Sequence, residues 1–508
     1  MDGVADESSK NDNLQNGWDG NTKSDAEDSS CIVPGIITPR STPSPAPSSS
    51  KSEEPPRKKM RTWDPEESYE IEKIVGYHIE DDDLNKMTYF VKWNGWSSKY
   101  NTYEPIENMT GCNLMLCEYF EVQKPSKRER EKMNKEVEDG LKTYEIYDKL
   151  KENSYNKMIL DEFSEDHLDI SGIFGQSLQR FKEETEKQYD LVIRTLIGMY
   201  SHRDPGMFRR AMNYKICLLL CKIREEQLDK LKELEKKINQ LESCRIVVEN
   251  NVDFDIFPND FNYDVKPSLG ENVVMPLDPP IGCECKGGCN LKSQCCGPAA
   301  NSFFAYNVHG KLRIPEHSAI YECNSKCTCS NNCVNRVVQR GRKVGLGIFK
   351  TEKCGWGVRA LEKISKGTFV CEYIGEIIRD SVAVVRDIDY VRRNISYLFD
   401  LDFNESDDQS DMYCIDATDV GNVARFINHS CEPNLNVFPV WIDCLDPNLP
   451  RLAFFAKKNI QKDEEIHFDY ENIQEEVEIS NEKTTRMITR IRCQCGSSKC
   501  REWVFGNK

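Results

Sequence analysis

The sequence predicts a multidomain chain with a mainly β C-terminal domain, cysteine-rich zinc modules around it, a small α+β module, a helical linker and a disordered N-terminus. Three observations support this. A chain of 508 residues is too long for one hydrophobic core. From about residue 344, short runs of β-branched and aromatic residues recur between Gly, Asn and Asp. Nine cysteines gather between Cys283 and Cys333, which indicates metal binding.

Composition and charge exclude several classes of protein. The chain has no run of about 18 apolar residues, so we expect no membrane span, and the polar start MDGVADESSKND is not a secretory signal. The net charge of −17 argues against general affinity for DNA, and we expect no sequence-specific nucleic-acid binding. The charge favours basic partners, although solubility alone would also explain it.

Residues 1–62 are rich in Ser, Pro, Asp and Asn and cannot bury a core. We therefore expect this segment to be disordered. It ends in the basic run RKKMR at 57–61. Such a run is typical of a nuclear import signal, although a solvated charge run would look the same.

Residues 67–123 change to a strand-like pattern. SYEIEKIVGYHI alternates between apolar and polar residues, and MTYFVKWNGW is rich in aromatic and β-branched residues. The polar run EDDDLN between them predicts a hairpin turn, and CNLMLCEYFEVQK follows with helical spacing. The pattern predicts a small module of three strands and one helix.

Residues 124–245 are charged and favour helix. The apolar residues Leu231, Leu234, Ile238 and Leu241 follow a 3,4,3 spacing, which extends over about two heptads. A coiled coil requires three or four, so a helical linker or helical hairpin is favoured over a dimer seam. Residues 246–280 contain several Pro, Asp and Asn and are expected to be loop-like.

The cysteine-dense segment predicts a structural zinc cluster. Zinc takes four tetrahedral ligands, and nine thiolates fit three ions if six are terminal and three each bridge two metals. No ligand position would then remain open for water, so the role is structural. The nine cysteines are Cys283, Cys285, Cys289, Cys295, Cys296, Cys323, Cys327, Cys329 and Cys333.

A second group, formed by Cys493, Cys495 and Cys500, is one ligand short of a zinc site. Cys431, in the segment NHSCEPN, is the best candidate for the fourth ligand. A zinc ion shared between residue 431 and the C-terminal cysteines would fold the tail back over the β domain. Two distant segments of the chain would then complete one binding site.

Long motifs in this chain resemble those of SET methyltransferases. Residues 344–470 contain GWG at 355–357, CEYIGE with Tyr373, SYLFDLD with Tyr397, RFINHSCEPN and EEIHFDY. Residues 281–341 resemble the pre-SET zinc module, 489–505 the post-SET loop, and 67–123, with YFVKWNGWSSKYNTYEP, a chromodomain. This order resembles the heterochromatin-associated methyltransferases of the Suppressor of variegation type, which act on lysine 9 of histone H3.

The resemblance implies direct transfer of a methyl group from S-adenosylmethionine to a lysine amine. The backbone around the Gly-Trp-Gly turn would approach the cofactor, as glycine allows. Backbone groups at residues 428 and 429 would hold its adenine and amino-acid ends, and an indole from the tail would cover the adenine. The implied cofactor residues are Gly355, Trp356, Gly357, Tyr397, Asn428, His429 and Trp503.

The resemblance also implies the catalytic group Tyr470, Tyr397, Phe468 and His429. An apolar channel formed by Tyr397 and Tyr470 would lower the pKa of the substrate lysine, about 10.4 when free. The Tyr470 hydroxyl would orient the amine. Phe468 would leave room for methylated amines, so we expect di- and trimethylation. No general base is evident, which favours proton loss through water.

In the chromodomain-like module, Tyr69, Trp93 and Trp96 would form a cage that binds a methylated ammonium by cation–π attraction. The alternative is that these rings are simply core. The implied partners are the histone H3 tail and other chromatin and heterochromatin proteins. The implied location is the nucleus, at pericentromeric heterochromatin, where the protein would silence genes.

A non-catalytic chromatin scaffold with a decayed SET fold is the rival hypothesis. Decay should first remove the residues that the chemistry requires. Because Tyr470, Asn428, His429 and the Gly-Trp-Gly turn are all present, the sequence favours an enzyme.

Overall fold

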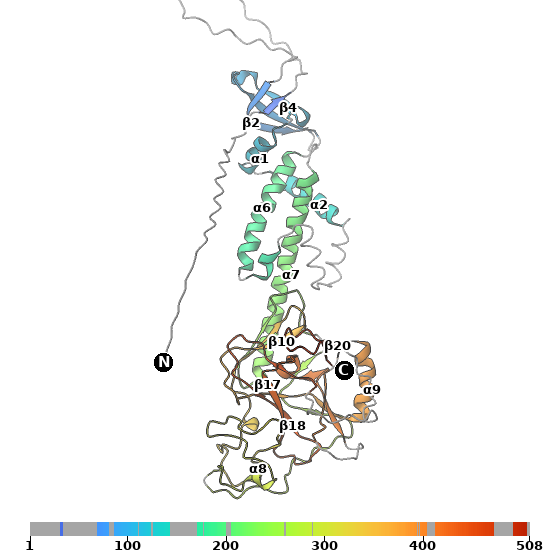
Figure 1. Ribbon diagram of the computed structural model, residues 1–508. Coiled ribbons are helices and arrows are strands. Elements are labelled where there is room, and N and C mark those ends of the chain that lie inside the picture. The colour runs from blue at the N-terminus through green and yellow to red at the C-terminus, as the bar shows by residue number, and fades with distance from the viewer. Residues whose placement is uncertain are drawn as a thin grey trace, which may run out of the picture. The chain divides into compact units, whose positions relative to one another are not determined.

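The computed structural model describes most of the chain from residue 69 onward (Figure 1). The described residues are 31–33, 69–80, 86–109, 111–122, 125–142, 170–175, 177–199, 205–258, 261–286, 288–393, 395, 397–403, 412–471 and 491–504. The expected import signal and most of the expected disordered segment lie outside them, as does the tip of the expected hairpin. None of the helices in these ranges has the length and hydropathy needed to cross a bilayer.

The chain divides into two compact units, Met1–Thr143 with Glu186–Tyr214, and Tyr144–Thr185 with Lys215–Lys508. The first unit contains a four-stranded antiparallel sheet in the order β1-β2-β3-β4. Its elements are β1 (Cys31–Val33), β2 (Tyr69–Ile79), β3 (Met87–Trp93), η3 (Ser98–Tyr100), β4 (Thr102–Pro105), η4 (Ile106–Asn108) and α1 (Asn113–Val122). The three strands and one helix expected here are present, and β1 adds a short strand from the N-terminal segment.

Alternation explains why β3 forms a strand: every second side chain is buried, beginning with Met87 and ending with Trp93. Leu116 and Phe120 of α1 are fully buried against this module. Glu104, near the end of β4, is buried as well and accepts a hydrogen bond from Asn108 Nδ2 at 2.9 Å.

The helical linker is confirmed as α2 (Lys127–Leu141), α5 (Ser171–Phe174), α6 (Leu178–Gly198) and α7 (Pro205–Leu241). A capping box starts α2, because the Ser126 hydroxyl accepts from the Glu129 amide and the Glu129 carboxylate accepts from the Ser126 amide. The apolar stripe of α7 is covered within the chain at Leu231 and Ile238 and partly at Leu234, whereas Leu241 is exposed. Leu231 and Ile238 are buried in the same core as the C-terminal strands, where helix packing rather than dimerisation buries them.

The second unit is mainly β (Figure 1). Its strands are β5 (Ile246–Glu249), β6 (Asn262–Tyr263), β7 (Ser268–Leu269), β8 (Ile320–Tyr321), β9 (Leu346–Lys350), β10 (Trp356–Ala360), β11 (Phe369–Tyr373), β12 (Glu376–Arg379), β13 (Leu398–Asp400), β14 (Tyr413–Asp416), β15 (Val420–Gly421), β16 (Asn428–His429), β17 (Leu435–Trp441), β18 (Arg451–Ala456), β19 (His467–Phe468), β20 (Ile491–Arg492) and β21 (Trp503–Val504). Its short helices are α8 (Cys296–Ala299), η6 (Val338–Arg340), α9 (Asp380–Arg392) and η8 (Val423–Phe426).

These strands form several small sheets. The larger ones have the orders β10-β9-β5, β11-β18-β17-β8 and β13-β14-β12-β7, and the two-stranded ones are β15-β6, β16-β19 and β20-β21. The expectation that residues 246–280 are loop-like holds for most of the described residues there, but it missed three short strands. Strands β5, β6 and β7 from this stretch pair in parallel with β9, β15 and β12. Strands of two to four residues are too short to show a period in the sequence.

Two short parallel strands position the candidate site. Asn428 pairs with His467 and His429 with Phe468, so that NHSCEPN and HFDY run side by side. Strand β10, with the Gly-Trp-Gly turn, belongs to the neighbouring sheet and shares the same core.

Candidate active site and metal centres

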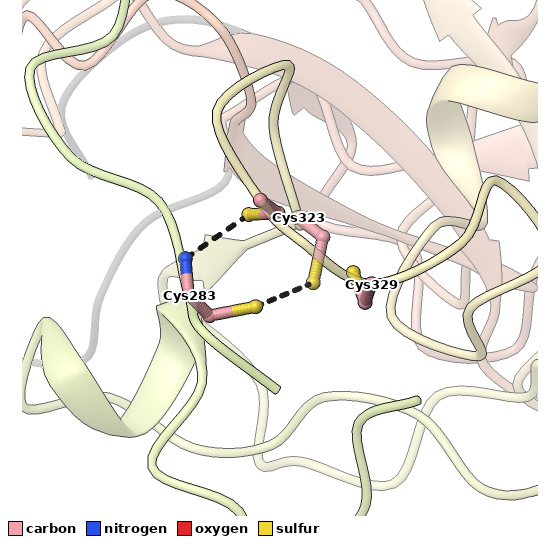
Figure 2. A group of neighbouring side chains, drawn as sticks. Cys283, Cys323 and Cys329 are labelled. Carbon is pink, nitrogen blue, oxygen red and sulfur yellow. Dashed lines mark hydrogen bonds between the residues drawn. The ribbon is translucent and has the colours of Figure 1, made fainter. Parts of the chain in front are cut away.

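The cysteines of residues 283–333 come together in space. The Sγ of Cys323 lies 3.9 Å from that of Cys283 and 3.5 Å from that of Cys289, and the Cys296 and Cys327 sulfurs are 3.4 Å apart. Figure 2 shows Cys283 next to Cys323 and Cys329, which both belong to the irregular stretch after β8. Three groups of sulfurs lie within 4.8 Å of one another: Cys283, Cys323, Cys327 and Cys329; Cys289, Cys323, Cys329 and Cys333; and Cys283, Cys285 and Cys289.

These groups overlap, which is what bridging thiolates require. Four cysteines each belong to two of them: Cys283, Cys289, Cys323 and Cys329. Cys295 is fully buried in the same cluster, and Asn335 Nδ2 donates to its sulfur and to that of Cys323, at 3.9 and 3.4 Å. Burial raises the pKa of Cys283 to about 11, so a bare thiol there stays protonated. Zinc stabilises the thiolate, and the donor set therefore fits zinc.

The second cysteine group also assembles. The sulfurs of Cys431, Cys493, Cys495 and Cys500 lie within 4.8 Å of one another, and those of Cys431 and Cys493 are 3.8 Å apart. Four cysteines at these distances fit one tetrahedral zinc ion. The C-terminal cysteines therefore lie next to Cys431 in the segment NHSCEPN, as predicted from the incomplete set of ligands.

An ion pair that sequence reasoning missed holds the same tail. Arg501, directly after the last cysteine, donates to both carboxylate oxygens of Asp469 at 2.6 and 2.7 Å and pairs with Glu471 at 3.2 Å. Asp469 stands between Phe468 and Tyr470. The sequence does contain opposite charges in the motifs FDYE and CREW. Because these charges are 32 positions apart, the sequence alone does not show that they pair.

The residues expected to hold the cofactor meet at β10. The Asn428 side-chain amide donates to the Trp356 carbonyl at 3.2 Å and to Glu465 Oε1 at 3.1 Å. Gly355 has φ of 70°, the left-handed region that favours glycine. At Gly357 a Cβ would lie 2.8 Å from Glu465 Oε1 and 3.1 Å from Asn428 Nδ2. Glycine is therefore required for Asn428 and Glu465 to approach this turn.

His429 connects the metal site to the Tyr470 segment. Its Nδ1 accepts from the Tyr470 amide at 3.2 Å, and its Nε2 lies 3.4 Å from Cys431 Sγ. Burial lowers the pKa of His429 to about 4 despite the opposing charge of Asp469, so the ring is neutral at pH 7. Trp503 lies in β21, next to the zinc group, in the strand that pairs with β20.

Two of the residues expected at the channel, Phe468 and Tyr470, lie in one aromatic cluster. Phe468 lies 4.7 Å from Tyr470 and stacks on Phe399 at 6.0 Å, centroid to centroid. The Tyr470 hydroxyl donates to the Ile427 carbonyl at 2.9 Å. Burial, with Tyr397 next in effect, raises the pKa of Tyr470, so its hydroxyl keeps its proton. The backbone carbonyl of Tyr397 accepts a hydrogen bond from the Tyr373 hydroxyl at 2.9 Å. This bond holds the backbone of Tyr397 in place.

The expected cage residues also lie together. The Tyr69 ring is 6.5 Å from Trp93 and 5.8 Å from Trp96, in edge-to-face contacts. Trp93 Nε1 donates to the Thr102 hydroxyl at 3.1 Å. Tyr100, which sequence reasoning missed, extends the cluster at 5.3 Å from Trp96.

Three family models match the chain. They are the Chromo (chromatin organisation modifier) domain at residues 69–122, the Pre-SET motif at 238–336 and the SET domain at 355–471.

Two curated relatives match most of the chain. The histone-lysine N-methyltransferase Su(var)3-9 of Drosophila pseudoobscura pseudoobscura is 35% identical over 506 residues, covering 95% of this chain and 74% of the relative. A histone-lysine N-methyltransferase of Schizosaccharomyces pombe (strain 972), named as H3 lysine-9 specific, is 32% identical over 498 residues, covering 87% of this chain and 99% of the relative. The crystal structure of Arabidopsis thaliana SUVH6 in complex with SAM is 34% identical, covers 53% of this chain and 55% of that chain, and has a TM-score of 0.44.

Proposed function

The chain belongs to the Su(var)3-9 family of histone-lysine N-methyltransferases, and from this premise we infer that it transfers methyl groups from S-adenosylmethionine to lysine 9 of histone H3. We propose further that the products are the di- and trimethylated forms, and that the chromodomain binds methyl-lysine. The acidic net charge of −17 suits a basic histone tail.

The observation that carries this proposal is the meeting of four distant segments at one place. Strand β10 contributes the Gly-Trp-Gly turn, β16 contributes Asn428 and His429, and β19 leads into Tyr470. The C-terminal tail is tied to the same place through Cys431 and Asp469. A scaffold without catalysis has no need for this arrangement.

On the cofactor side, the chain would act mainly by orientation. S-adenosylmethionine, when bound, supplies an electrophilic methyl group. The Trp356 carbonyl and Glu465 occupy both hydrogens of the Asn428 amide nitrogen. The amide oxygen is therefore the atom that this side chain offers to a donor on the cofactor.

On the lysine side, Tyr470 would hold the amine. Its hydroxyl donates to the Ile427 carbonyl, and its oxygen would accept a hydrogen bond from the substrate amine. An acceptor held in place by a backbone contact needs little reorganisation during the reaction. Phe468, beside it and almost fully buried, offers no polar atom and would leave space for a methylated amine to turn.

Transfer of a radiolabelled methyl group from S-adenosylmethionine to a histone H3 tail peptide tests the function. We expect label on the natural peptide and none on a peptide with arginine in place of lysine 9. Absence of transfer to any histone peptide would favour the scaffold hypothesis.

Metal content tests the zinc assignment separately. Three ions in the bridged cluster and one at the C-terminal site give about four zinc ions per chain. Elemental analysis of the purified protein measures this ratio. A value near two would contradict the bridged arrangement.

For partners and location, we propose binding to other chromatin and heterochromatin proteins and residence at pericentromeric heterochromatin. The chromodomain supports this proposal, since a module that binds the product mark would retain the enzyme where the mark already exists.

A further inference from the structure

Arg425, in η8, is a buried cation that forms no ion pair with any residue that the structure describes. The residue is 8% exposed, its Nε donates to the Ala417 carbonyl at 2.7 Å, and one Nη donates to the Thr418 carbonyl at 3.2 Å. Across the described ranges, no carboxylate oxygen lies within 4.0 Å of its guanidinium. By contrast, the half-buried Arg386 pairs with Asp416 at 2.8 Å.

Aromatic rings surround this cation. Its guanidinium carbon lies 3.7 Å from the ring centroid of Tyr397, 4.5 Å from that of Phe261 and 5.2 Å from that of Phe426. Contact with Tyr397 places the positive charge against a ring that is expected to line the lysine channel. A buried charge that lacks a partner is costly, and such groups concentrate at functional sites.

We propose that Arg425 keeps the substrate lysine neutral by repelling a second positive charge from the channel lined by Tyr397. The proposal rests on the proposed function. Lysine enters as an ammonium ion and must release one proton to water before its nitrogen lone pair attacks the methyl group. A fixed cation favours the neutral amine over the ammonium form.

The transfer step itself does not change the charge of the channel. The new nitrogen–carbon bond forms as the sulfur–carbon bond breaks, and the positive charge moves from sulfur to nitrogen. Arg425 therefore acts on the loss of the proton and has little effect on the step that follows. This separation makes its role measurable.

The other charged and titratable groups that face Arg425 do not cancel it. Asp416 is already matched by Arg386 and by the Tyr390 hydroxyl. Burial raises the pKa of Tyr373, so it is neutral in the working range. Tyr397 offers its ring face, and Asp419 acts from beyond contact distance. Burial lowers the pKa of Arg425, but a guanidinium keeps its charge in a protein.

The test is the dependence of kcat on pH for a histone H3 tail peptide, in the natural protein and in Arg425→Met and Arg425→Lys. The Met variant keeps an unbranched side chain, although a shorter one, and removes the charge. The Lys variant keeps the charge. Without the cation, bound lysine retains its proton to higher pH. We expect the midpoint of the curve to rise by about one pH unit in Arg425→Met, with the high-pH plateau preserved within a few-fold.

Arg425→Lys should keep the natural midpoint even if its plateau falls. Arg425→Gln, which retains a donor for the Ala417 carbonyl, replaces the Met variant if that protein does not fold. An unchanged midpoint in the uncharged variants would overturn the proposal and leave Arg425 a structural role. A natural protein without transfer at any pH would instead refute the proposed function.

Discussion

The proposed cage of the chromodomain and the proposed channel of the SET domain are both clusters of aromatic rings, but they differ in the charge next to the rings. Next to the cage, Lys92 is matched by Glu72 at 2.6 Å, and it donates to the carbonyls of Trp93 and Trp96. Behind the channel, Arg425 has no such partner among the described residues. Ring faces attract a cation where the background charge is balanced, and an unbalanced cation opposes the ammonium form. On our proposals, similar rings would therefore serve the binding of methyl-lysine in one module and the deprotonation of lysine in the other.

The two sites also differ in what they hold in place. In the cage, Trp93 is held through its indole nitrogen by Thr102, which fixes a ring face. In the channel, the Tyr470 hydroxyl is held by the Ile427 carbonyl, which fixes an oxygen. A ring face is enough to bind a methylated cation, whereas methyl transfer requires an oriented nitrogen lone pair.

The largest effect should come from Cys500→Ala, which disrupts the catalytic module alone. Removal of one of the four sulfurs should release the zinc ion and the tail, so methyl transfer should fall to background. Binding of a methyl-lysine peptide should not change, because the cage lies in the other unit. Cys244→Ala, outside the metal groups, is the control and should retain activity. Unchanged turnover in Cys500→Ala would remove the argument for a composite site.

The metal groups were predictable because the spacing of the cysteines can be read from the sequence, and the fourth ligand Cys431 followed from the incomplete set.

The environment of Arg425 was not predictable. An arginine in RFINH is ordinary, and its lack of a carboxylate partner arises only when the chain folds Tyr397 over it. Glu465 was missed for the same reason, since its contact with Asn428 joins two segments. Strand β5 pairs in parallel with β9, about a hundred positions away, and a four-residue strand leaves no periodic signal.

Tyr470→Phe should give the next largest effect. The ring stays and one hydroxyl is lost, so the fold should persist while turnover falls by about a hundredfold, or roughly 3 kcal/mol. Turnover and thermal unfolding of the variant measure the two quantities. Tyr390→Phe removes a hydroxyl that bonds Asp416 instead, and it should be close to normal. Near-normal turnover in Tyr470→Phe would show that this residue only lines the channel.

Trp93→Ala should separate the reader from the enzyme. Loss of one cage ring should weaken binding of a trimethyl-lysine peptide by about 2 kcal/mol or more, roughly thirtyfold, and spare transfer to a free peptide. Because Trp93 is almost fully buried, Trp96→Ala serves as a second variant with less effect on the core. Tyr103→Ala, exposed and packed on Phe90, is the control. Full affinity in both tryptophan variants, measured by calorimetry, would refute the cage assignment.

The smallest effect on rate, and the sharpest on product, should come from Phe468→Tyr. Phe468 and Tyr470 are two positions apart, so in an extended segment their side chains face the same way. Their rings lie 4.7 Å apart, and Phe468 also stacks on Phe399. A new hydroxyl at this position would hold a water molecule in the space where a methylated amine must turn.

The first transfer needs no such turn and should remain nearly intact in Phe468→Tyr. Later transfers require the amine to place a fresh lone pair in line with the methyl donor, and the held water would obstruct that rotation. We therefore expect the natural protein to reach di- and trimethyl-lysine, and the variant to stop at mono- or dimethyl-lysine. Mass spectrometry of a histone H3 tail peptide after long reaction times measures the distribution. A natural protein that stops at one methyl group, or a variant that still adds three, would show that Phe468 does not set the product.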